Sequence, residues 1–153
     1  MTKLPKTIAY KGYDIPTGKT PADLKKRKEI ITHFYKTWGG SPVERKVRNN
    51  ELKRFIHVNE KSVDETRYWA CLSAQSTLTV LELTYVLKHA VKVDENPANP
   101  NKKSQKDLEK MLVMECVVPS LRPYVKTAKL TVGVIKQVGR KRQYCLTAKE
   151  NGR

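Results

Sequence analysis

Three histidines, His33, His57 and His89, are the side chains that can donate and accept protons near neutral pH, because the ordinary histidine pKa is about 6.5. His89 follows Lys88 at the end of an apolar helical pattern, and we take it as the candidate general acid or base. The helix macrodipole alone also favours a histidine at a helix C-terminus, so a structural role for His89 stays open. We interpret His57, on a short strand, as a structural or surface residue, and His33 as incidental.

Cations and hydroxyl groups that suit a phosphate are concentrated in the C-terminal part of the chain. Lys129 and Arg142 could stabilise negative charge that develops on a phosphate, and Thr131 could position one of its oxygens. Together with His89, these three residues form the candidate catalytic set. Thr147 offers the same hydroxyl chemistry, although threonine is also simply a common strand residue. The predicted phosphate-binding cations are Lys126, Lys129, Lys136, Arg140, Lys141 and Arg142.

The stretch from Tyr124 to Ala148 predicts a two-stranded antiparallel hairpin. Alternate residues of its first arm are apolar, which is the period-two pattern of a strand with one covered face. Gly139 supplies the turn, because glycine takes the positive φ that a tight hairpin needs. A turn centred there gives facing residues whose numbers sum to about 278, which places Thr131 opposite Thr147. We expect the basic residues 140–142 to be solvated.

The charge balance is the strongest compositional signal. The sequence has 31 lysines and arginines against 15 aspartates and glutamates, a net charge of +16. From Leu121 onward there are nine basic residues and one acid. A basic hairpin in a basic protein points to a polyanionic partner, of which nucleic acid is the commonest, and a merely solvated surface is the alternative. The KKRK run at 25–28 is interpreted as a solvated helix face rather than a nuclear address.

Cysteine spacing and hydropathy bear on metal binding, redox compartment and membrane association. The three cysteines are widely spaced and form no CxxC pair, so we expect free thiols in a reducing cytosol, no zinc or other metal site, and no cofactor. The sequence has no apolar run of membrane-spanning length and no secretory leader, so we expect a cytoplasmic protein without a membrane partner.

Helices are predicted before strands along the chain. Thr20 predicts the start of one helix, Ser62 begins a capping box for the next, and Thr77 begins an apolar helix. Residues 94–105 are predicted to form a loop. This order predicts an α+β fold in which N-terminal helices pack on a C-terminal antiparallel β-meander.

Two parts of the chain are distinguished by this pattern. Residues 1–50 are predicted to be a basic N-terminal arm plus a helix, packed on or appended to the rest. Residues 51–150 are predicted to be the α+β domain that binds nucleic acid.

Three segments resemble the endoribonuclease-like superfamily that includes barnase, RelE and the colicin nucleases. They are SVDET at 62–66, LTYVLKHAVKV at 83–93, and AKLTVGVIKQVGRKRQYCLTA at 128–148, and they cover roughly residues 55–150. The chain looks most like the nuclease-like domains of large polyvalent proteins in phages and conjugative elements. The resemblance implies RNA cleavage without a metal, in which a 2′-hydroxyl attacks the adjacent phosphate.

The leading hypothesis is a basic RNA-binding domain, with RNA favoured over DNA and RNA cleavage left open. One alternative is a non-catalytic nucleic-acid-binding accessory protein of a phage or mobile element. Another is an interaction module for an acidic protein partner. Catalysis requires His89 to face the same cleft as Lys129, Thr131 and Arg142, whereas binding alone does not.

Overall fold

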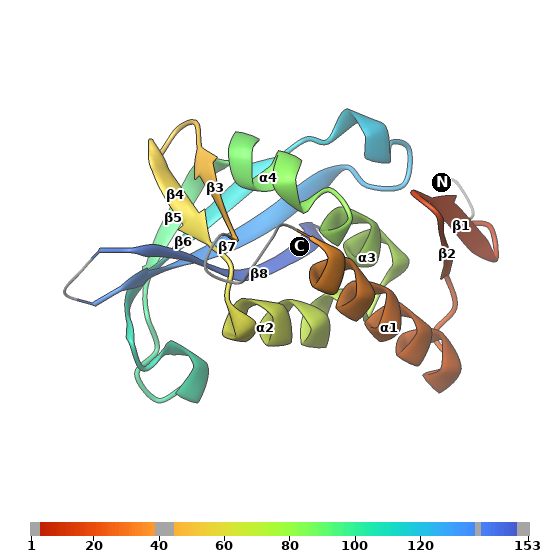
Figure 1. Cartoon of the computed structure of the whole chain (residues 1–153), viewed down its shortest axis with the longest axis horizontal. Helices are drawn as coiled ribbons and strands as arrows, with labels where there is room; N and C mark the ends of the chain where they lie inside the picture. Colours follow the sequence, from red (N-terminus) through yellow and green to blue (C-terminus); the bar gives the residue numbers. More distant parts are fainter. Residues whose placement is uncertain (1–3, 39–44, 137–138, 150–153) are drawn as a thin grey trace.

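The computed structural model describes residues 4–38, 45–136 and 139–149, and it shows helices packed on one face of a six-stranded sheet (Figure 1). A separate two-stranded hairpin lies beside α1 and α3. The helices are α1 (Pro21–Thr37), α2 (Glu60–Ala70), α3 (Ala74–Val80) and α4 (Leu83–His89). The strands are β1 (Thr7–Tyr10), β2 (Tyr13–Pro16), β3 (Lys46–Asn49), β4 (Arg54–His57), β5 (Val91–Pro97), β6 (Leu108–Cys116), β7 (Thr127–Ile135) and β8 (Lys141–Lys149).

The strands of the main sheet lie in the order β3-β4-β8-β7-β6-β5. Neighbouring strands are antiparallel except β4 and β8, which pair in parallel, so the sheet is mixed. The fold is α+β, but the predicted order of helices followed by a meander is wrong. The β1–β2 hairpin precedes α1, and β3 and β4 precede α2. The predicted meander is part of a larger sheet because β4 pairs with the edge of β8.

Thr20 begins α1 as predicted. Its side chain accepts a hydrogen bond from the Asp23 amide, and the Asp23 carboxylate accepts one from the Thr20 amide. These two bonds satisfy amide groups that have no partner inside the helix. The apolar side of α1 then packs into the core through Ile30 and Ile31.

The starts of α2 and α3 differ from the predicted ones. Asn59, rather than Ser62, is the N-cap of α2, and Ser62 completes the capping box from the third helical position. Ser73, rather than Thr77, is the N-cap of α3. Thr77 instead lies within the helix, where its hydroxyl donates to the backbone. Both predicted caps had the right residue type, but Asn59 and Ser73, which lie three and four positions earlier, already cap the two helices.

Part of the predicted N-terminal arm, residues 1–19, forms the β1–β2 hairpin. Lys11 and Gly12 make its turn with φ values of 50° and 85°. Ile8 and Ile15 face each other across the two strands, and both are buried. The same hydrophobic cluster also contains Leu130 of β7, so residues from both predicted parts of the chain contribute to one core.

The register between β7 and β8 differs from the predicted one. Thr131 faces Cys145 rather than Thr147. The turn is not centred on Gly139, as the sequence predicted. The amide of Ile135 donates to the carbonyl of Arg140 at 2.8 Å, which shows that these two residues face each other. The residue numbers of facing pairs in β7 and β8 therefore sum to less than the predicted value of about 278.

A bulge at Tyr144 changes which side chains of β8 face the helices. Val132 pairs with Gln143, and Gly133 pairs with Arg142, after a register shift at the bulge. Because Val132 packs in the core, Gln143 also faces the helices and Arg142 faces the other way.

A buried polar network fixes Gln143 to the helical layer. Its amide nitrogen donates to the hydroxyl oxygens of Tyr35 and Thr66, both at 2.9 Å. The hydroxyl of Ser62 donates to the backbone carbonyl of Gln143. These contacts join α1 and α2 to β8 next to the bulge.

The loop predicted at residues 94–105 begins later than expected. β5 continues to Pro97 as an exposed edge strand, paired with β6. The segment 98–107 follows it and contains a short 3-10 turn at Lys103–Gln105.

Candidate nucleic-acid interface

The main sheet has one face against the helices and a second, which we call the open face. In β7, Leu130 and Val132 pack in the core, so Lys129 and Thr131 lie on the open face. Lys129 is exposed and pairs with Thr147 of β8. The hydroxyl of Thr131 donates to the Cys145 carbonyl at 3.3 Å. Lys129 and Thr147 therefore lie side by side, and Thr131 lies one step further along β7.

Arg142 also lies on the open face, but it is not solvated as predicted. Its side chain forms a two-pronged ion pair with Asp107, at 2.8 Å and 3.3 Å, and the residue is only 4% exposed. The prediction was wrong because segment 98–107 covers this part of the sheet, where Leu108 and Met111 are buried as well. The guanidinium group of Arg142 lowers the pKa of Asp107. The guanidinium N–H groups of Arg142 that could bind a phosphate are therefore bonded to Asp107 instead.

His89 lies apart from the other three predicted catalytic residues. It ends α4, whose apolar side packs in the core on the helical face of the sheet. Its ring lies 4.4 Å from the ring of Tyr85, and its Nδ1 lies 3.5 Å from Nδ2 of Asn50. The predicted set of four catalytic residues therefore does not share one cleft.

The other predicted phosphate-binding cations are divided between the two ends of β7. Lys126 precedes the strand, whereas Lys136 follows it, and both are exposed. The 9 residues of β7 separate them by roughly 30 Å. Arg140 is exposed near Lys136, while the ammonium group of Lys141 donates to the Gly139 carbonyl at 2.9 Å.

A cluster that the sequence analysis did not single out lies where β3, β4 and β8 meet. Ile56 packs in the core, so its neighbours Phe55 and His57 lie on the open face. The β3–β4 register places Arg48 opposite Phe55 and Lys46 opposite His57. We call this cluster the basic patch, and its members are Lys46, Arg48, Phe55, His57 and Arg140.

The basic patch combines exposed positive charge with an exposed ring. Phe55 is 46% exposed, and the Lys46 ammonium lies 4.7 Å from its ring centroid. Within the described part of the chain, Lys46, Arg48 and Arg140 form no ion pair. The density of basic residues in the sequence RKVRNNELKR at 45–54 was a signal for this surface. It was missed because two four-residue strands are too short to show a clear alternation.

His57 is the titratable member of the basic patch. Burial, then the positive charges of Arg140 and Lys46, lower its pKa from the ordinary value. Its imidazole is therefore neutral at neutral pH and can accept a proton. The sequence pattern showed a histidine on a short strand, but it could not show these two cations beside it.

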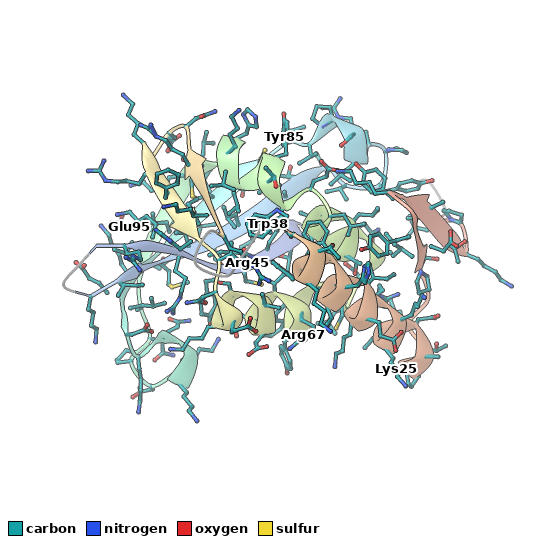
Figure 2. All side chains as sticks on the ribbon, viewed as in Figure 1. Lys25, Trp38, Arg45, Arg67, Tyr85 and Glu95 are labelled. Carbon is teal, nitrogen blue, oxygen red and sulfur yellow. The ribbon has the colours of Figure 1, made fainter. Side chains whose placement is uncertain are left out.

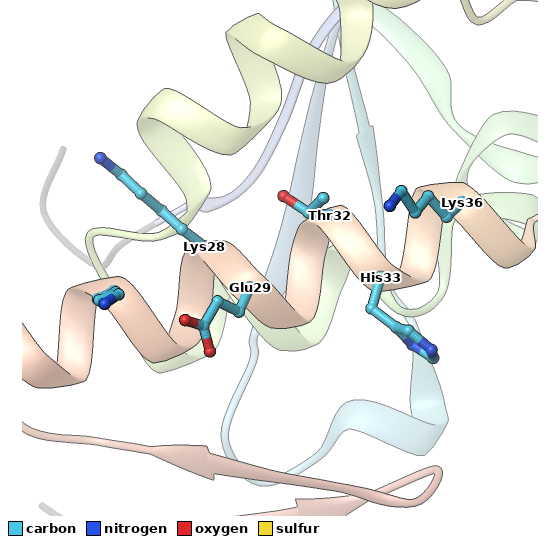
Figure 3. Close-up of a pocket in the computed structure, with 6 residues that line it drawn as sticks. Lys28, Glu29, Thr32, His33 and Lys36 are labelled. Carbon is cyan, nitrogen blue, oxygen red and sulfur yellow. The ribbon is translucent and has the colours of Figure 1, made fainter.

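A second basic surface runs along α1. A shallow depression there is lined by Lys25, Lys28, Glu29, Thr32, His33 and Lys36. Figure 3 shows Lys28 and Thr32 pointing to one side of the helix, and Glu29 and His33 pointing to the other. His33 is bonded through Nδ1 to the hydroxyl of Tyr13 at 2.6 Å. These side chains diverge, so they form a charged helix face rather than a reaction site.

This helix face is separated from α4 as well. Figure 2 shows Lys25 and Arg67 along the edge formed by α1 and α2, and Tyr85 at the opposite edge. The Tyr85–His89 pair and the α1 surface are therefore different regions of the molecule.

The cysteines and acids do not form a further site. The three cysteines are free thiols, and burial raises the pKa of Cys116 and raises that of Cys145 to about 12. Among the described residues, no group of three or more His, Cys, Asp and Glu side chains could hold a metal ion. None of the helices in the described ranges has the length and apolar character needed to cross a membrane.

Comparisons with protein-family models, with curated proteins and with solved structures give no match for this chain. Charge and geometry are therefore the observations that bear on its function.

Proposed function

We propose that the protein binds RNA through its open face, with the basic patch as the main contact. The observation that carries this proposal is the grouping of exposed cations that form no ion pair with any described residue: Lys46 and Arg48 lie on one face of β3, and Arg140 is close enough to His57 for its charge to act there. Cations of this kind attract a polyanion, and release of the counterions condensed on its phosphates drives binding. The resemblance to endoribonuclease-like proteins favours RNA over DNA.

The net charge of +16 supports the same proposal at longer range. Lys129 is a further exposed cation on the open face, where it pairs with Glu115 of β6 and Thr147 of β8. Three free thiols are consistent with a reducing compartment, and we place this binding in the cytoplasm.

The experiment that tests this function is a binding titration across a salt series. A single-stranded RNA of about ten nucleotides should bind with a log–log slope of about −3.5, which is the value for five phosphate contacts. A DNA duplex of the same length should bind more weakly. An affinity that does not change with salt, or no binding at low salt, would contradict the proposal. Tighter binding of polyglutamate than of RNA would instead favour an acidic protein partner.

RNA cleavage is a second candidate function, and His57 is the observation that favours it. A neutral imidazole beside Lys46 and Arg140 can accept the proton of a 2′-hydroxyl. The 2′-oxygen then bonds to the adjacent phosphorus, the bond from phosphorus to the 5′-oxygen breaks, and the leaving oxygen takes a proton from water. Lys46 and Arg140 would stabilise the negative charge of the transition state.

A cleavage assay in excess chelator separates this candidate from binding alone. The variant His57→Ala should lose about 100-fold in rate, the usual share of a general base, whereas the matched variant His89→Ala should keep it. An RNA whose 2′-hydroxyls are replaced by hydrogen should not be cut. Equal rates for wild type and His57→Ala would remove His57 from the mechanism. No cleavage of any RNA would favour a non-catalytic accessory protein of a phage or mobile element.

A further inference from the structure

Phe55 is an apolar ring within the basic patch. Its neighbour in sequence, Ile56, is fully buried against the helices, whereas Phe55 is 46% exposed on the open face. The strand β4 lies between β3 and β8: Phe55 itself pairs with Arg48 of β3, and the next residue, Ile56, pairs with Lys141 of β8. The ring is therefore presented by a rigid element rather than by a loop.

The surroundings of Phe55 are cationic. Arg48 of β3 lies opposite Phe55, and the Lys46 ammonium lies 4.7 Å from the centroid of the Phe55 ring. A lysine ammonium that lies over an aromatic ring leaves the ring readily when a phosphate competes for it, and the ring face is then free to contact another partner. The patch thus offers an aromatic face and phosphate-binding groups within one short stretch of sheet.

Other exposed aromatic side chains of the described residues are placed differently. Tyr68 and Trp69 contact each other edge to face, with ring centroids 5.0 Å apart. The ring of Tyr85 contacts that of His89, with centroids 4.4 Å apart and the ring planes tilted by 40°. Phe55 has a cation as its ring contact, so it is the exposed ring best placed beside a bound phosphate chain.

An unpaired nucleotide matches both features of this surface. Aromatic side chains on an open sheet stack with bases whose faces are free, and the neighbouring phosphates are held by lysine and arginine. A continuous duplex does not offer a free base face, because its bases already stack on one another. The combination favours a single strand over a duplex.

We propose that Phe55 is the stacking platform for an unpaired base, so that the ligand class of the basic patch is single-stranded RNA. This inference rests on the proposed RNA binding. It assigns Lys46 and Arg48 to the phosphates that flank the stacked base, and it makes Phe55 the residue that distinguishes single strands from duplexes.

Abasic RNA tests the stacking separately from the charge. The two probes are a single-stranded oligouridylate of about ten nucleotides and an abasic ribose-phosphate oligomer of the same length. Wild type should bind the oligouridylate about tenfold more tightly than the abasic oligomer, which is within the usual effect of stacking one base. Phe55→Leu should lose this preference, and Phe55→Tyr should keep it.

Trp69→Leu is the matched control, because Trp69 is 44% exposed and lies on α2. It should bind both probes as wild type does. Equal, salt-dependent binding of both probes by wild type would overturn the stacking inference and leave the proposed function standing. A preference that persists in folded Phe55→Leu would also overturn it. No binding of either probe would contradict both proposals.

Discussion

His57 is the residue through which protonation and RNA binding should be coupled. In the free protein its pKa is lowered by burial and by the charges of Arg140 and Lys46. The folded pKa lies below the unfolded one, so the contribution of His57 to stability is present above the unfolded value, about 6.5, and is lost as pH falls through the folded pKa. A bound phosphate raises the pKa of His57, because its negative charge favours the protonated ring.

The affinity for RNA should therefore rise as the pH falls from about 7.5 to about 5.5 at constant salt, because binding raises the pKa of His57. His57→Gln should lose most of this pH dependence. His89→Gln, which changes a histidine on the opposite side of the sheet, should keep it. Titrations by fluorescence anisotropy over this pH range measure both. A pH dependence lost in His89→Gln but kept in His57→Gln would contradict the placement of RNA on the open face.

At the scale of elements, β8 is held in register by the network around Gln143. The amide nitrogen of Gln143 donates to the hydroxyl of Tyr35 in the core, and burial raises the pKa of Tyr35 to about 12. Removing this acceptor leaves part of a buried amide without a partner.

Tyr35→Phe should lower the free energy of unfolding by about 1–2 kcal/mol, the usual cost of an unsatisfied buried polar group. Tyr13→Phe is the control, because it removes a hydroxyl that is bonded to His33 at an exposed position. That change should alter stability by about 0.5 kcal/mol or less. Urea denaturation of the two variants measures the difference. Equal stabilities would contradict the view that the network holds β8.

The Asp107–Arg142 ion pair joins segment 98–107 to β8. Asp107→Asn should lower the free energy of unfolding at pH 7 by about 1–3 kcal/mol, because it removes the charged partner of a buried guanidinium. The pKa of Asp107 is lowered in the folded state. The difference between wild type and variant should thus be complete above the ordinary aspartate pKa, about 3.9, and should vanish as pH falls through the lowered value. A difference that persists in strong acid would contradict this assignment.

Sequence patterns predicted elements whose signals are local. Thr20 begins α1 as expected, and the apolar alternation of β7 identified its buried face. The bulge at Tyr144 and the parallel pairing of β4 with β8 were not predictable, because both depend on contacts between distant segments. Arg142 was expected to be solvated for the same reason, since Asp107 is 35 residues earlier in the chain.

The candidate site shows the same limit. The predicted cations Lys129 and Arg140 are exposed, whereas the predicted general acid or base, His89, lies on the helical side of the sheet. Four members of the basic patch come from residues 45–57, and the fifth, Arg140, directly precedes β8. The pairing of β4 with β8 brings these two segments together. His57 gains its altered pKa from this assembly, which a sequence pattern does not encode.

At the scale of the whole molecule, the layers separate two basic surfaces. The helices cover one face of the sheet (Figure 1). The lysines of α1 lie on the helical side, while the open face carries the basic patch. Both surfaces attract polyanions at long range, so net charge alone does not distinguish them. The proposed function requires that phosphates contact the basic patch directly.

The salt dependence of RNA binding in two matched double variants tests this claim most directly. Lys46→Gln with Arg48→Gln removes two charges from the basic patch, and Lys25→Gln with Lys28→Gln removes two from α1. The first pair should reduce the magnitude of the negative log–log slope by about 1.4, which corresponds to the loss of two contacts with a single strand. The second should leave the slope within about 0.5 of the wild-type value, because distant charges act through long-range attraction only. A slope whose magnitude falls in the α1 variant and not in the patch variant would contradict binding through the open face.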